Sequence, residues 1–387
     1  MTKLPHQDFI FFSSTDWHGL WGSRQQIAIR LAKRGHRILF VERPIGLEHW
    51  LKYPAFRQRT RRRRREGLVE VESNLWIFKM PVLLPGKYQS IFINRRFQQL
   101  TVQVVRPLVQ QLNFQNPILW LYNPENRALI GEFDEKLAVY HCIDEWTANT
   151  SGRKRRIIET LERELVIHSD IVFANSPPTF ETKRSLNSRC YRLPSGVDFQ
   201  HFSKPGSPII NSDIPRPRIG YSGTINERLD YSLLNQIAVE NPNWSFILAG
   251  NPYPWTLETP PLRALLALPN VYYVGQYTYD QMPRFLNDLD VCLVPYVQDD
   301  RGHYRSPLKL YEYLAAGKAV VSVPNPESQE FSNTIWLGQS AAGFSNGIKE
   351  ALNLESSDQV QARQTVAEKH DWDQRVDTIL ATICSVI

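Results

Sequence analysis

The amino-acid sequence predicts an α/β protein with two doubly wound domains, each built on a parallel sheet. The chain opens as strand, helix and strand: an apolar run at Phe9–Phe12, a helical pattern over residues 23–34 that ends at Gly35, and an apolar run at 37–42. Short apolar strands and helical segments go on alternating, which is typical of parallel sheets. We expect two such halves to face a cleft, because ligands of these folds bind in such places.

A segment at residues 201–217 separates the two sets of elements. It is rich in Pro, Ser and Asn and has no hydrophobic period, which is typical of a linker. Further strands are expected at 117–122, 137–143, 170–175, 218–222, 244–249, 271–274, 291–294 and 319–323, with helices at 153–167 and 230–240. The final thirty residues are expected to form one long helix or two shorter ones. The predicted domains are therefore 1–200, the linker 201–217, 218–365, and a C-terminal helix at 366–387 that packs back on the first domain.

Length and composition exclude several classes of protein. A chain of 387 residues with 42% hydrophobic residues is long enough for two domains with cores of their own. The four cysteines lie far apart without a CxxC pair, which argues against a disulfide scaffold or a structural zinc site and fits a reducing compartment. No run of eighteen apolar residues occurs, and the first apolar run is too short for a signal peptide. Secreted, collagenous and integral-membrane proteins are excluded.

The positive charge gathers in the first half of the chain. Residues 1–190 carry 30 Lys+Arg and 18 Asp+Glu, whereas the rest of the chain carries 15 and 21. Much of the excess lies in 153–156 and in the run Arg61, Arg62, Arg63, Arg64 and Arg65, which follows an amphipathic stretch at 46–56. Such runs attract anionic surfaces. We favour an anionic membrane surface over a flexible solvated loop, and both over nucleic acid, because no nucleic-acid motif is present.

The segment RSPLKLYEYLAAGKAVV, residues 305–321, predicts a short helix with a phosphate site at its start. Ser306 suits the N-cap, Pro307 the first helical position and Gly317 the C-terminal end. Free N–H groups in the first turn, including that of Leu308, suit a phosphate. Lys309 and Glu312 are three residues apart and share a face, so a diphosphate beside Lys309 and a diol beside Glu312 would explain both. The alternative is a packed helix with a surface lysine and glutamate.

Three further groups of residues follow predicted strands. Gly223 and Thr224 come after the strand at 218–222, with Arg228 close by and a helix expected to open near Glu227. Glycine lets the backbone approach a phosphate closely, and Arg228 could pair with it. A plain tight turn is equally compatible with these residues. Asp16 and His18 follow the first strand, where His18 could act as a general base or both residues could simply belong to a helix-capping loop.

Asp144 and Glu145 follow the strand at 137–143. In an extended chain they point in opposite directions, so one of them is expected to face the cleft. A carboxylate there could accept a proton from a hydroxyl, and the alternative is an acidic helix start capped by Asp144.

These segments together resemble the GT-B-fold glycosyltransferases, in particular the family 1/4-like group that includes bacterial teichuronic-acid and exopolysaccharide glycosyltransferases. The resemblance covers nearly the whole chain. It is carried by LAKRGHRILFVE, HSDIVFANSPPTFETKR, LPSGVDFQHF, IGYSGTI, NVYYVGQYTYDQMP, DVCLVPY, SPLKLYEYLAAGKAVV and HDWDQRV. It implies two Rossmann-like domains, with the acceptor on the first and a nucleotide sugar on the second.

The resemblance also implies roles for particular residues. Glu312 matches the glutamate that hydrogen-bonds the donor ribose, and Gly223 with Thr224 matches the segment under the diphosphate. Lys309 and Arg228 would balance the diphosphate charge, beside the helix start at Ser306, Pro307 and Leu308, and Gln276 and Tyr277 would lie near the base. Basic side chains and helix N-termini usually replace a metal in this fold, so we expect no metal and no cofactor besides the nucleotide sugar as substrate.

The chain departs from the family pattern at three places. Tyr304 stands where retaining family 4 enzymes have a second glutamate, Ser195 stands where asparagine is usual, and no lysine follows soon after Arg228. Retention of configuration is therefore not implied. If the enzyme inverts, it needs a base near the acceptor, for which Asp144 is our first choice, followed by Asp16 and His18.

We therefore expect a glycosyltransferase of hexosyltransferase type. It would act on a glycan or a lipid-linked acceptor in cell-surface polysaccharide synthesis, in the cytoplasm and peripherally at the inner face of the membrane, without nucleic acid. Alternatives are a sugar-nucleotide 2-epimerase-like enzyme and a non-catalytic membrane-surface scaffolding protein of the same fold. An NAD-dependent oxidoreductase fits less well, because the glycine spacing differs from GxGxxG. The sugar, the base, the acceptor and the oligomeric state stay open.

Overall fold

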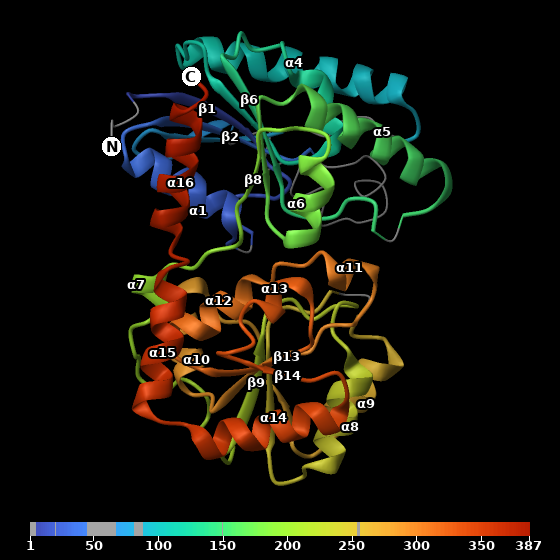
Figure 1. Cartoon of the computed structure of the whole chain (residues 1–387), viewed down its shortest axis with the longest axis vertical. Coiled ribbons are helices and arrows are strands. Elements are labelled where there is room, and N and C mark those ends of the chain that lie inside the picture. The colour runs from blue at the N-terminus through green and yellow to red at the C-terminus, as the bar shows by residue number, and fades with distance from the viewer. Residues whose placement is uncertain (1–4, 20, 45–66, 81–87, 149, 254–255) are drawn as a thin grey trace. The chain divides into compact units, whose positions relative to one another are not determined.

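The computed structural model describes residues 5–19, 21–44, 67–80, 88–148, 150–253 and 256–387. The chain divides into two compact units, the first made of Met1–Pro194 with Arg375–Ile387 and the second of Ser195–Gln374. Each unit is built on a sheet of mainly parallel strands connected by helices (Figure 1). The predicted fold class, two Rossmann-like parallel-sheet domains, is confirmed.

The first unit holds an eight-stranded sheet in the order β3-β4-β2-β1-β5-β6-β7-β8. All neighbouring strands are parallel except β3 and β4, which form an antiparallel hairpin that the sequence analysis missed. The elements are β1 (Asp8–Phe12), α1 (Ser23–Lys33), β2 (Arg37–Glu42), β3 (Leu68–Glu72), β4 (Leu75–Lys79), α4 (Ile91–Gln111), β5 (Ile118–Leu121), η1 (Pro124–Leu129), β6 (Leu137–Cys142), α5 (Gly152–His168), β7 (Ile171–Ala174), α6 (Pro177–Arg184) and β8 (Cys190–Arg192).

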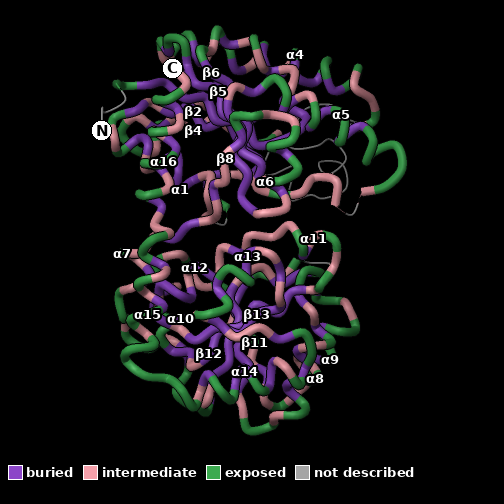
Figure 2. The backbone as a smooth tube through the Cα atoms, viewed as in Figure 1, coloured by how far each residue is buried: buried purple, intermediate pink, exposed green. Residues whose placement is uncertain are grey.

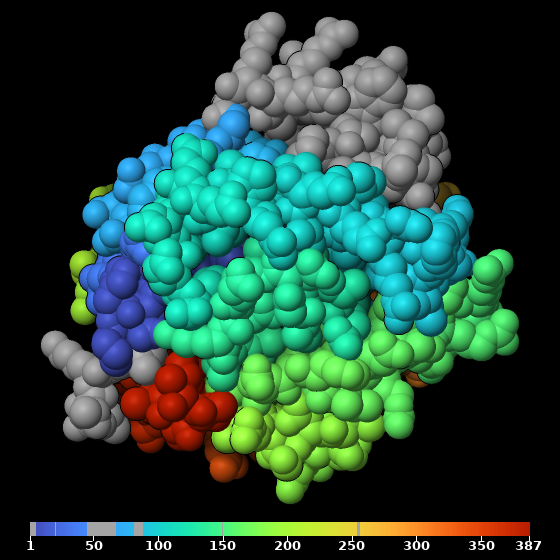
Figure 3. Space-filling view, turned by 90° about the horizontal axis from the view of Figure 1, so that it is seen from above, coloured from blue at the N-terminus to red at the C-terminus, as the bar shows by residue number. Residues whose placement is uncertain are grey.

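Alternate residues of these strands face two different layers of the first unit. Phe12 of β1 and Leu121 of β5 join a core with residues of α4 and α5, so these helices cover one face of the sheet. α4 lies at the surface of the unit (Figure 3). On the other face, Phe11 stacks on Trp120 with ring centroids 5.2 Å apart. α1 covers this second face, because its Arg24 lies over the ring of Tyr122.

The second unit holds a six-stranded parallel sheet in the order β11-β10-β9-β12-β13-β14. Its buried strands form the interior of the unit (Figure 2). The elements are α7 (Phe199–Phe202), β9 (Arg218–Ser222), α8 (Tyr231–Glu240), β10 (Ser245–Ala249), α9 (Pro260–Leu266), β11 (Val271–Tyr273), η2 (Tyr279–Gln281), α10 (Met282–Asn287), β12 (Val291–Val294), α11 (Asp300–His303), α12 (Leu308–Ala315), β13 (Ala319–Ser322), α13 (Pro326–Gln329), β14 (Trp336–Leu337), α14 (Ala341–Leu354) and α15 (Ser357–Glu368). The last helix, α16 (Trp372–Cys384), begins in this unit and continues into the first.

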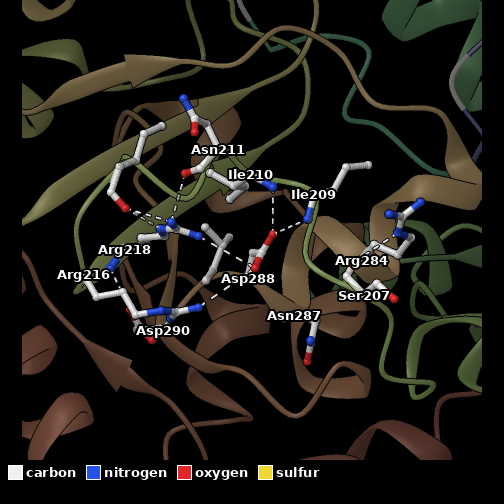
Figure 4. A network of polar contacts seen from close by, with 12 residues as sticks. Ser207, Ile209, Ile210, Asn211, Arg216, Arg218, Arg284, Asn287, Asp288 and Asp290 are labelled. Atoms are coloured by element: carbon white, nitrogen blue, oxygen red, sulfur yellow. Dashed lines mark hydrogen bonds and ion pairs between the residues drawn. The ribbon is translucent and has the colours of Figure 1, made fainter.

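A polar network attaches the end of the predicted linker to the second unit (Figure 4). The buried carboxylate of Asp288 accepts a hydrogen bond from the backbone N–H of Ile210 at 2.8 Å and lies 3.7 Å from the Arg218 guanidinium. Asp290, which precedes β12, accepts the backbone N–H of Arg218 at 2.7 Å. These bonds fix the start of β9 beside β12, where the strand order of the sheet reverses. The predicted domain ranges themselves stay a prediction.

The C-terminal residues form two helices, α15 and α16, rather than one. Between them Asp371 forms a bridge with Val197, and its side chain accepts the backbone N–H of Phe199 at 2.9 Å. The last part of α16 belongs to the first unit, where Asp377 forms an ion pair with Arg34 at 3.0 Å. Over the described residues, no helix has the length and hydropathy needed to cross a membrane.

Candidate functional site

The sheet of the second unit opens between β9 and β12 at its carboxyl end. β9 pairs with β10 from Arg218 to Ser222, but it pairs with β12 only at Ile219 and Gly220. Instead, the backbone N–H of Ser222 donates a hydrogen bond to the hydroxyl of Tyr313 on α12, at 2.9 Å. Because β9 and β12 are also the strands at which the order of the sheet reverses, this opening is the place where doubly wound sheets bind their ligands.

A loop with unusual backbone geometry follows β9 at this opening. Gly223 has φ +140°, and Gly250, which follows β10, has φ +144°. A Cβ on Gly250 would lie 1.7 Å from the carbonyl oxygen of Gly223, so a side chain there would displace the neighbouring loop. Both positions therefore require glycine for conformation, and Gly250 requires it for space as well. The two loops are consequently held close together beneath any ligand at the opening.

The side chain of Lys309 lies over this loop. A Cβ on Gly223 would fall 2.1 Å from Cε and 2.2 Å from Nζ of Lys309, and Nζ lies 5.3 Å from the centroid of the Tyr221 ring. In the described part of the chain the Lys309 ammonium makes no hydrogen bond and no ion pair. An ammonium in this state, beside glycine backbone and an aromatic face, suits an anionic ligand.

Lys309 belongs to the first turn of α12, whose start differs from the prediction. The helix begins at Leu308 with Pro307 as N-cap and no side-chain cap. Ser306 does not cap it, because its hydroxyl donates to the buried carboxylate of Glu327 at 3.0 Å and is thus engaged elsewhere. Within the described residues the backbone N–H groups of Leu308 and Lys309 have no acceptor, so they remain available to an anion. Gly317 follows the helix with φ +70°, as predicted.

Glu312 lies one turn further along α12. Burial raises the pKa of its carboxyl group to about 7, although the Lys309 ammonium acts in the opposite direction. The side chain is partly exposed, and no residue in the described ranges donates a hydrogen bond to it. A carboxylate that is partly desolvated and unbonded can accept hydroxyl groups of a ligand, such as the two hydroxyls of a ribose.

Thr224 and Arg228 lie on the loop that leads from β9 to α8. The carbonyl of Thr224 accepts the hydroxyl of Tyr221 at 3.1 Å, and the carbonyl of Arg228 accepts the backbone N–H of Val297 at 2.9 Å. The Arg228 guanidinium is exposed. α8 begins at Tyr231, as the helix expected at 230–240 predicts and four residues after Glu227. Asp230 is its N-cap and accepts a hydrogen bond from the backbone N–H of Leu233.

Arg305 is a cation of this site that the sequence analysis missed. Its guanidinium lies 5.2 Å from the ring centroid of Tyr296, donates to the carbonyl of Val297 at 3.2 Å and lies 3.5 Å from Asp299. Burial lowers the pKa of Arg305, and the nearby Arg228 charge acts in the same direction. The signal in the sequence was its place directly before Ser306, but only the fold brings it next to Arg228.

A cavity of about 220 Å³ lies beside these cations at the carboxyl ends of β12 and β13. Arg305, His303 and Asn325 contribute polar side chains to it. The short helix α13 follows directly, and Asn325 accepts the backbone N–H of Ser328 at its start. The cavity has a size suited to a small polar group.

Gln276 and Tyr277 lie beyond the end of β11, at the other edge of the sheet. Gln276 is exposed, whereas the Tyr277 ring packs against Phe285 of α10 with centroids 4.9 Å apart. Burial raises the pKa of Tyr277. In the strand order only β10 separates β11 from β9, whose following loop lies under Lys309. A base beside Tyr277 and a diphosphate over Gly223 would therefore both lie at the carboxyl ends of these strands.

The proposed bases lie in the first unit at the carboxyl edge of its sheet. Asp144 follows β6, is half exposed and lies 3.9 Å from the guanidinium of Arg24. Asp16 and His18 lie on the loop after β1, and β5 separates that strand from β6. Two strand spacings amount to about 10 Å, so these residues and Asp144 serve different positions along the edge. Asp144 does not cap a helix, because the next helix, α5, begins only at Gly152.

Glu145 points away from Asp144 into a buried ionic network, as the alternation of the extended chain predicts. Its carboxylate lies 3.7 Å from the ammonium of Lys183, which also lies 2.9 Å from Glu162. Glu162 in turn accepts the hydroxyl of Tyr140 at 2.7 Å. Despite desolvation, the neighbouring negative charges raise the pKa of Lys183. Glu145 is thus engaged inside the unit and Asp144 is the member of the pair that faces outward.

Two predictions cannot be placed on the structure. The run Arg61–Arg65 lies outside the described residues. Among the residues that are described, no group of three or more His, Cys, Asp or Glu side chains is arranged to hold a metal ion. The expectation that the reaction needs no metal stays a prediction.

Comparison with known proteins gives matches in sequence and in fold. Residues 230–381 match the model of a family described as glycosyl transferase-like. The chain is 24% identical over 329 residues to a protein described as a teichuronic acid biosynthesis glycosyltransferase, TuaH of Bacillus subtilis (strain 168), with 79% of this chain and 82% of that one covered.

Two solved structures share the fold over nearly the whole chain. One is a sucrose-phosphate synthase from Thermosynechococcus elongatus, with a TM-score of 0.74 and 13% identity over 98% of this chain and 99% of that one. The other is Anabaena HepE, solved in complex with UDP and glucose, with a TM-score of 0.67 and 14% identity over 98% of this chain and all of that one. The chain therefore has the GT-B fold, and the family match and the curated relative support a glycosyltransferase.

Proposed function

We propose that the chain transfers a sugar from a nucleoside diphosphate sugar to a hydroxyl of a glycan or a lipid-linked acceptor in cell-surface polysaccharide synthesis. The observation that carries the proposal is the opening between β9 and β12, where Gly223, Lys309 and Glu312 are combined. The description of the relative TuaH names teichuronic acid biosynthesis, and HepE was solved with UDP and glucose, which supports the choice of donor and pathway.

The second unit would hold the donor through the donor's diphosphate, ribose and base. The diphosphate would accept hydrogen bonds from the backbone N–H groups of Leu308 and Lys309. It would also form an ion pair with the Lys309 ammonium, with Arg228 nearby. The same groups would stabilise the charge that develops on the leaving nucleoside diphosphate. Glu312 would accept the ribose hydroxyls, and Gln276 with Tyr277 would lie near the base. The transferred sugar would then lie toward the cavity at β12 and β13.

The acceptor hydroxyl would lose its proton to a residue of the first unit if the reaction inverts configuration. Asp144 suits this role best, because its carboxylate is exposed and Glu145 is engaged in the interior. Asp16 and His18 follow as candidates. If the reaction retains configuration, the same residues would orient the acceptor instead.

A thermal-shift panel with UDP, GDP, ADP, dTDP and CMP tests the donor site. One nucleotide should stabilise the wild type, because ligand at a hundred times its dissociation constant adds about 2.7 kcal/mol. Glu312→Gln should lose most of this stabilisation, and the matched control Glu240→Gln on the exposed face of α8 should retain it. No shift with any nucleotide would favour the non-catalytic alternative, and turnover of the donor alone into another sugar would favour the epimerase-like one.

We also propose that the protein works in the cytoplasm at the inner face of the membrane. The excess of positive charge in residues 1–190, with the run Arg61–Arg65, suits an anionic leaflet, to which each cation adds about 1 kcal/mol. Co-sedimentation with vesicles containing anionic lipid tests this. Replacing Arg61–Arg65 by glutamine should release the protein, whereas unchanged binding would contradict the proposal.

A further inference from the structure

The carboxyl edge of the first unit's sheet ends in buried polar atoms that have no hydrogen-bond partner among the described residues. They follow or end four adjacent strands, β1, β5, β6 and β7. The atoms are Ser14 Oγ, Tyr122 Oη, His141 Nδ1 and Asn175 Oδ1, and each belongs to a residue that is at most 9% exposed. Buried polar atoms are normally hydrogen-bonded, so an unsatisfied row at the edge where such sheets bind ligands points to a missing partner.

Arg24 brings a positive charge to this edge. It lies in the first turn of α1, and its Cζ is 5.5 Å from the centroid of the Tyr122 ring, which in turn lies 5.2 Å from the ring of His141. Its Nε is buried and finds no hydrogen-bond acceptor in the part of the chain that the structure describes. The side chain is 14% exposed, so most of the guanidinium has left water.

The charge of Arg24 is only partly balanced. Asp144 lies 3.9 Å away, beyond hydrogen-bond distance, and its side chain is 54% exposed. Burial lowers the pKa of Arg24, the neighbouring charge of Arg43 acts in the same direction, and Asp144 opposes both. Burial and Arg24 together lower the pKa of His141 to about 3, so the imidazole is neutral near pH 7 and adds no charge. Arg24 is thus a largely buried cation whose carboxylate neighbour Asp144 is half exposed and is not hydrogen-bonded to it.

A purely structural arginine would be expected to use its donors within the protein. Arg24 is instead held against an aromatic ring with an unused buried donor, an arrangement that lowers stability unless a ligand completes it. Guanidinium groups bind phosphate and carboxylate with two parallel hydrogen bonds. The Tyr122 hydroxyl is a second unused donor beside it.

We propose that Arg24, with the Tyr122 hydroxyl, binds an oxyanion group of the acceptor, a phosphoryl or a carboxylate group, at the carboxyl edge of the first unit's sheet. The identification of the ligand as the acceptor rests on the proposed glycosyltransferase function, whereas the anion site itself does not. In this arrangement Arg24 positions the acceptor through its charged group, and Asp144 lies close enough to the same group to meet a neighbouring hydroxyl. The acceptor is thereby an acidic or phosphorylated molecule rather than a neutral sugar.

Calorimetric titration of full-length protein with glucose, glucose 6-phosphate and glucuronate tests the site. UDP is added in excess so that the donor site is filled. If UDP does not bind, the titration is made with the Lys309→Met variant, which lacks the cation of the donor site. At least one anionic sugar should bind the wild type ten or more times more tightly than glucose. A further arm measures co-sedimentation with phosphatidylcholine vesicles that contain polyprenyl diphosphate, compared with phosphatidylcholine alone. If the protein binds these vesicles but neither anionic sugar, the source of the anion is a lipid phosphate.

The variants are Arg24→Met, Arg24→Lys and the control Arg96→Met on the exposed side of α4. Arg24→Met should abolish the preference for the anion, Arg24→Lys should restore part of it, and Arg96→Met should leave it unchanged. UDP binding should persist in all three, which separates a failure here from a failure of the donor site. Equal binding of glucose and the anionic probes, no binding in either arm, or full anion binding by Arg24→Met would overturn the proposal.

Stability of the ligand-free variant gives an independent readout. An arginine that serves to bind a ligand, and that leaves a donor unused in the ligand-free protein, can be replaced without lowering the stability of that protein. Arg24→Met should therefore melt at the wild-type temperature or above it. A structural arginine would behave oppositely, and a fall in melting temperature of more than about 4 °C, the shift that roughly corresponds to losing one ordinary interaction, would overturn the proposal.

Discussion

Lys309 lies so close over Gly223 that the two positions act as one unit: a Cβ on Gly223 would fall 2.1 Å from Cε of Lys309. The glycine lets the loop after β9 and the first turn of α12 approach each other, and the lysine covers that loop with a positive charge. The Tyr313 hydroxyl, bound to the N–H of Ser222, fixes α12 at the same place. Phosphate binding at the second unit therefore depends on both residues.

Replacing Gly223 by alanine should weaken binding of nucleoside diphosphate by roughly the ten- to hundredfold that a lost charge-assisted contact costs. The new methyl group would displace the Lys309 side chain, and the backbone at φ +140° would be strained as well. Calorimetry on the purified variant measures the affinity. Gly131→Ala is the control, because Gly131 has φ +90° but open space around it, so it carries the strain without the clash. Strain alone lowers stability by about 1–2 kcal/mol. Nucleotide binding by Gly223→Ala equal to that of the control would contradict the account.

Lys309→Met should weaken binding of the nucleoside diphosphate by roughly ten- to a hundredfold, because a charge-assisted contact contributes about 1.5–3 kcal/mol. The matching nucleoside without phosphates should bind both proteins equally, since Lys309 would contact only the diphosphate. Lys349→Met, an exposed position on α14, serves as the control. An equal loss of affinity for nucleoside and diphosphate would show that Lys309 supports the fold of the site instead.

The pH dependence of stability should change in Glu312→Gln. The folded-state pKa of Glu312 is raised to about 7 from an ordinary value of 4.5, so the fold favours the protonated form. Ionisation of this group therefore lowers stability as the pH rises from about 4.5 to about 7, and the loss is complete above pH 7. Urea denaturation should show the ligand-free glutamine variant gaining on the wild type over this range, by up to about 3 kcal/mol. A constant difference between the two proteins from pH 4.5 to 8 would contradict the raised pKa.

Lys183→Met should destabilise the protein by about 3–5 kcal/mol. The substitution leaves the buried carboxylates of Glu145 and Glu162 without their cation. Chemical denaturation at pH 7 measures the loss. The double variant Lys183→Met/Glu162→Gln should recover part of it, because one buried charge is then removed as well. A loss below about 1 kcal/mol in the single variant would show that the network contributes little.

The sequence was sufficient for the alternation of strands and helices, because apolar runs and helical periods are local patterns. β1, α1, β2, β9 and β12 lie where their residues predict. The hairpin β3–β4 was missed although β4 holds the apolar run Leu75–Phe78, because its partner β3 alternates with two exposed glutamates and offers no such run. The start of α12 was misplaced by one residue because the hydroxyl of Ser306 binds Glu327, a partner 21 positions away that local spacing does not reveal.

The site was predictable only where its residues are neighbours in the chain. Lys309 and Glu312 share a helix, so their common face followed from spacing. Arg24 and Arg305 were missed because their importance depends on Tyr122 and Arg228, which the fold brings to them from distant segments. The raised pKa of Glu312 is likewise a result of burial and has no signature in the sequence.

The most direct test of the donor site is a crystal structure of the protein with UDP, or with whichever nucleotide the thermal-shift panel selects. The account predicts diphosphate oxygens about 3 Å from the N–H groups of Leu308 and Lys309 and from Nζ of Lys309, with the ribose hydroxyls at the same distance from the Glu312 carboxylate. A nucleotide bound elsewhere, with Lys309 still lying over Gly223 and Glu312 without a ligand, would contradict it.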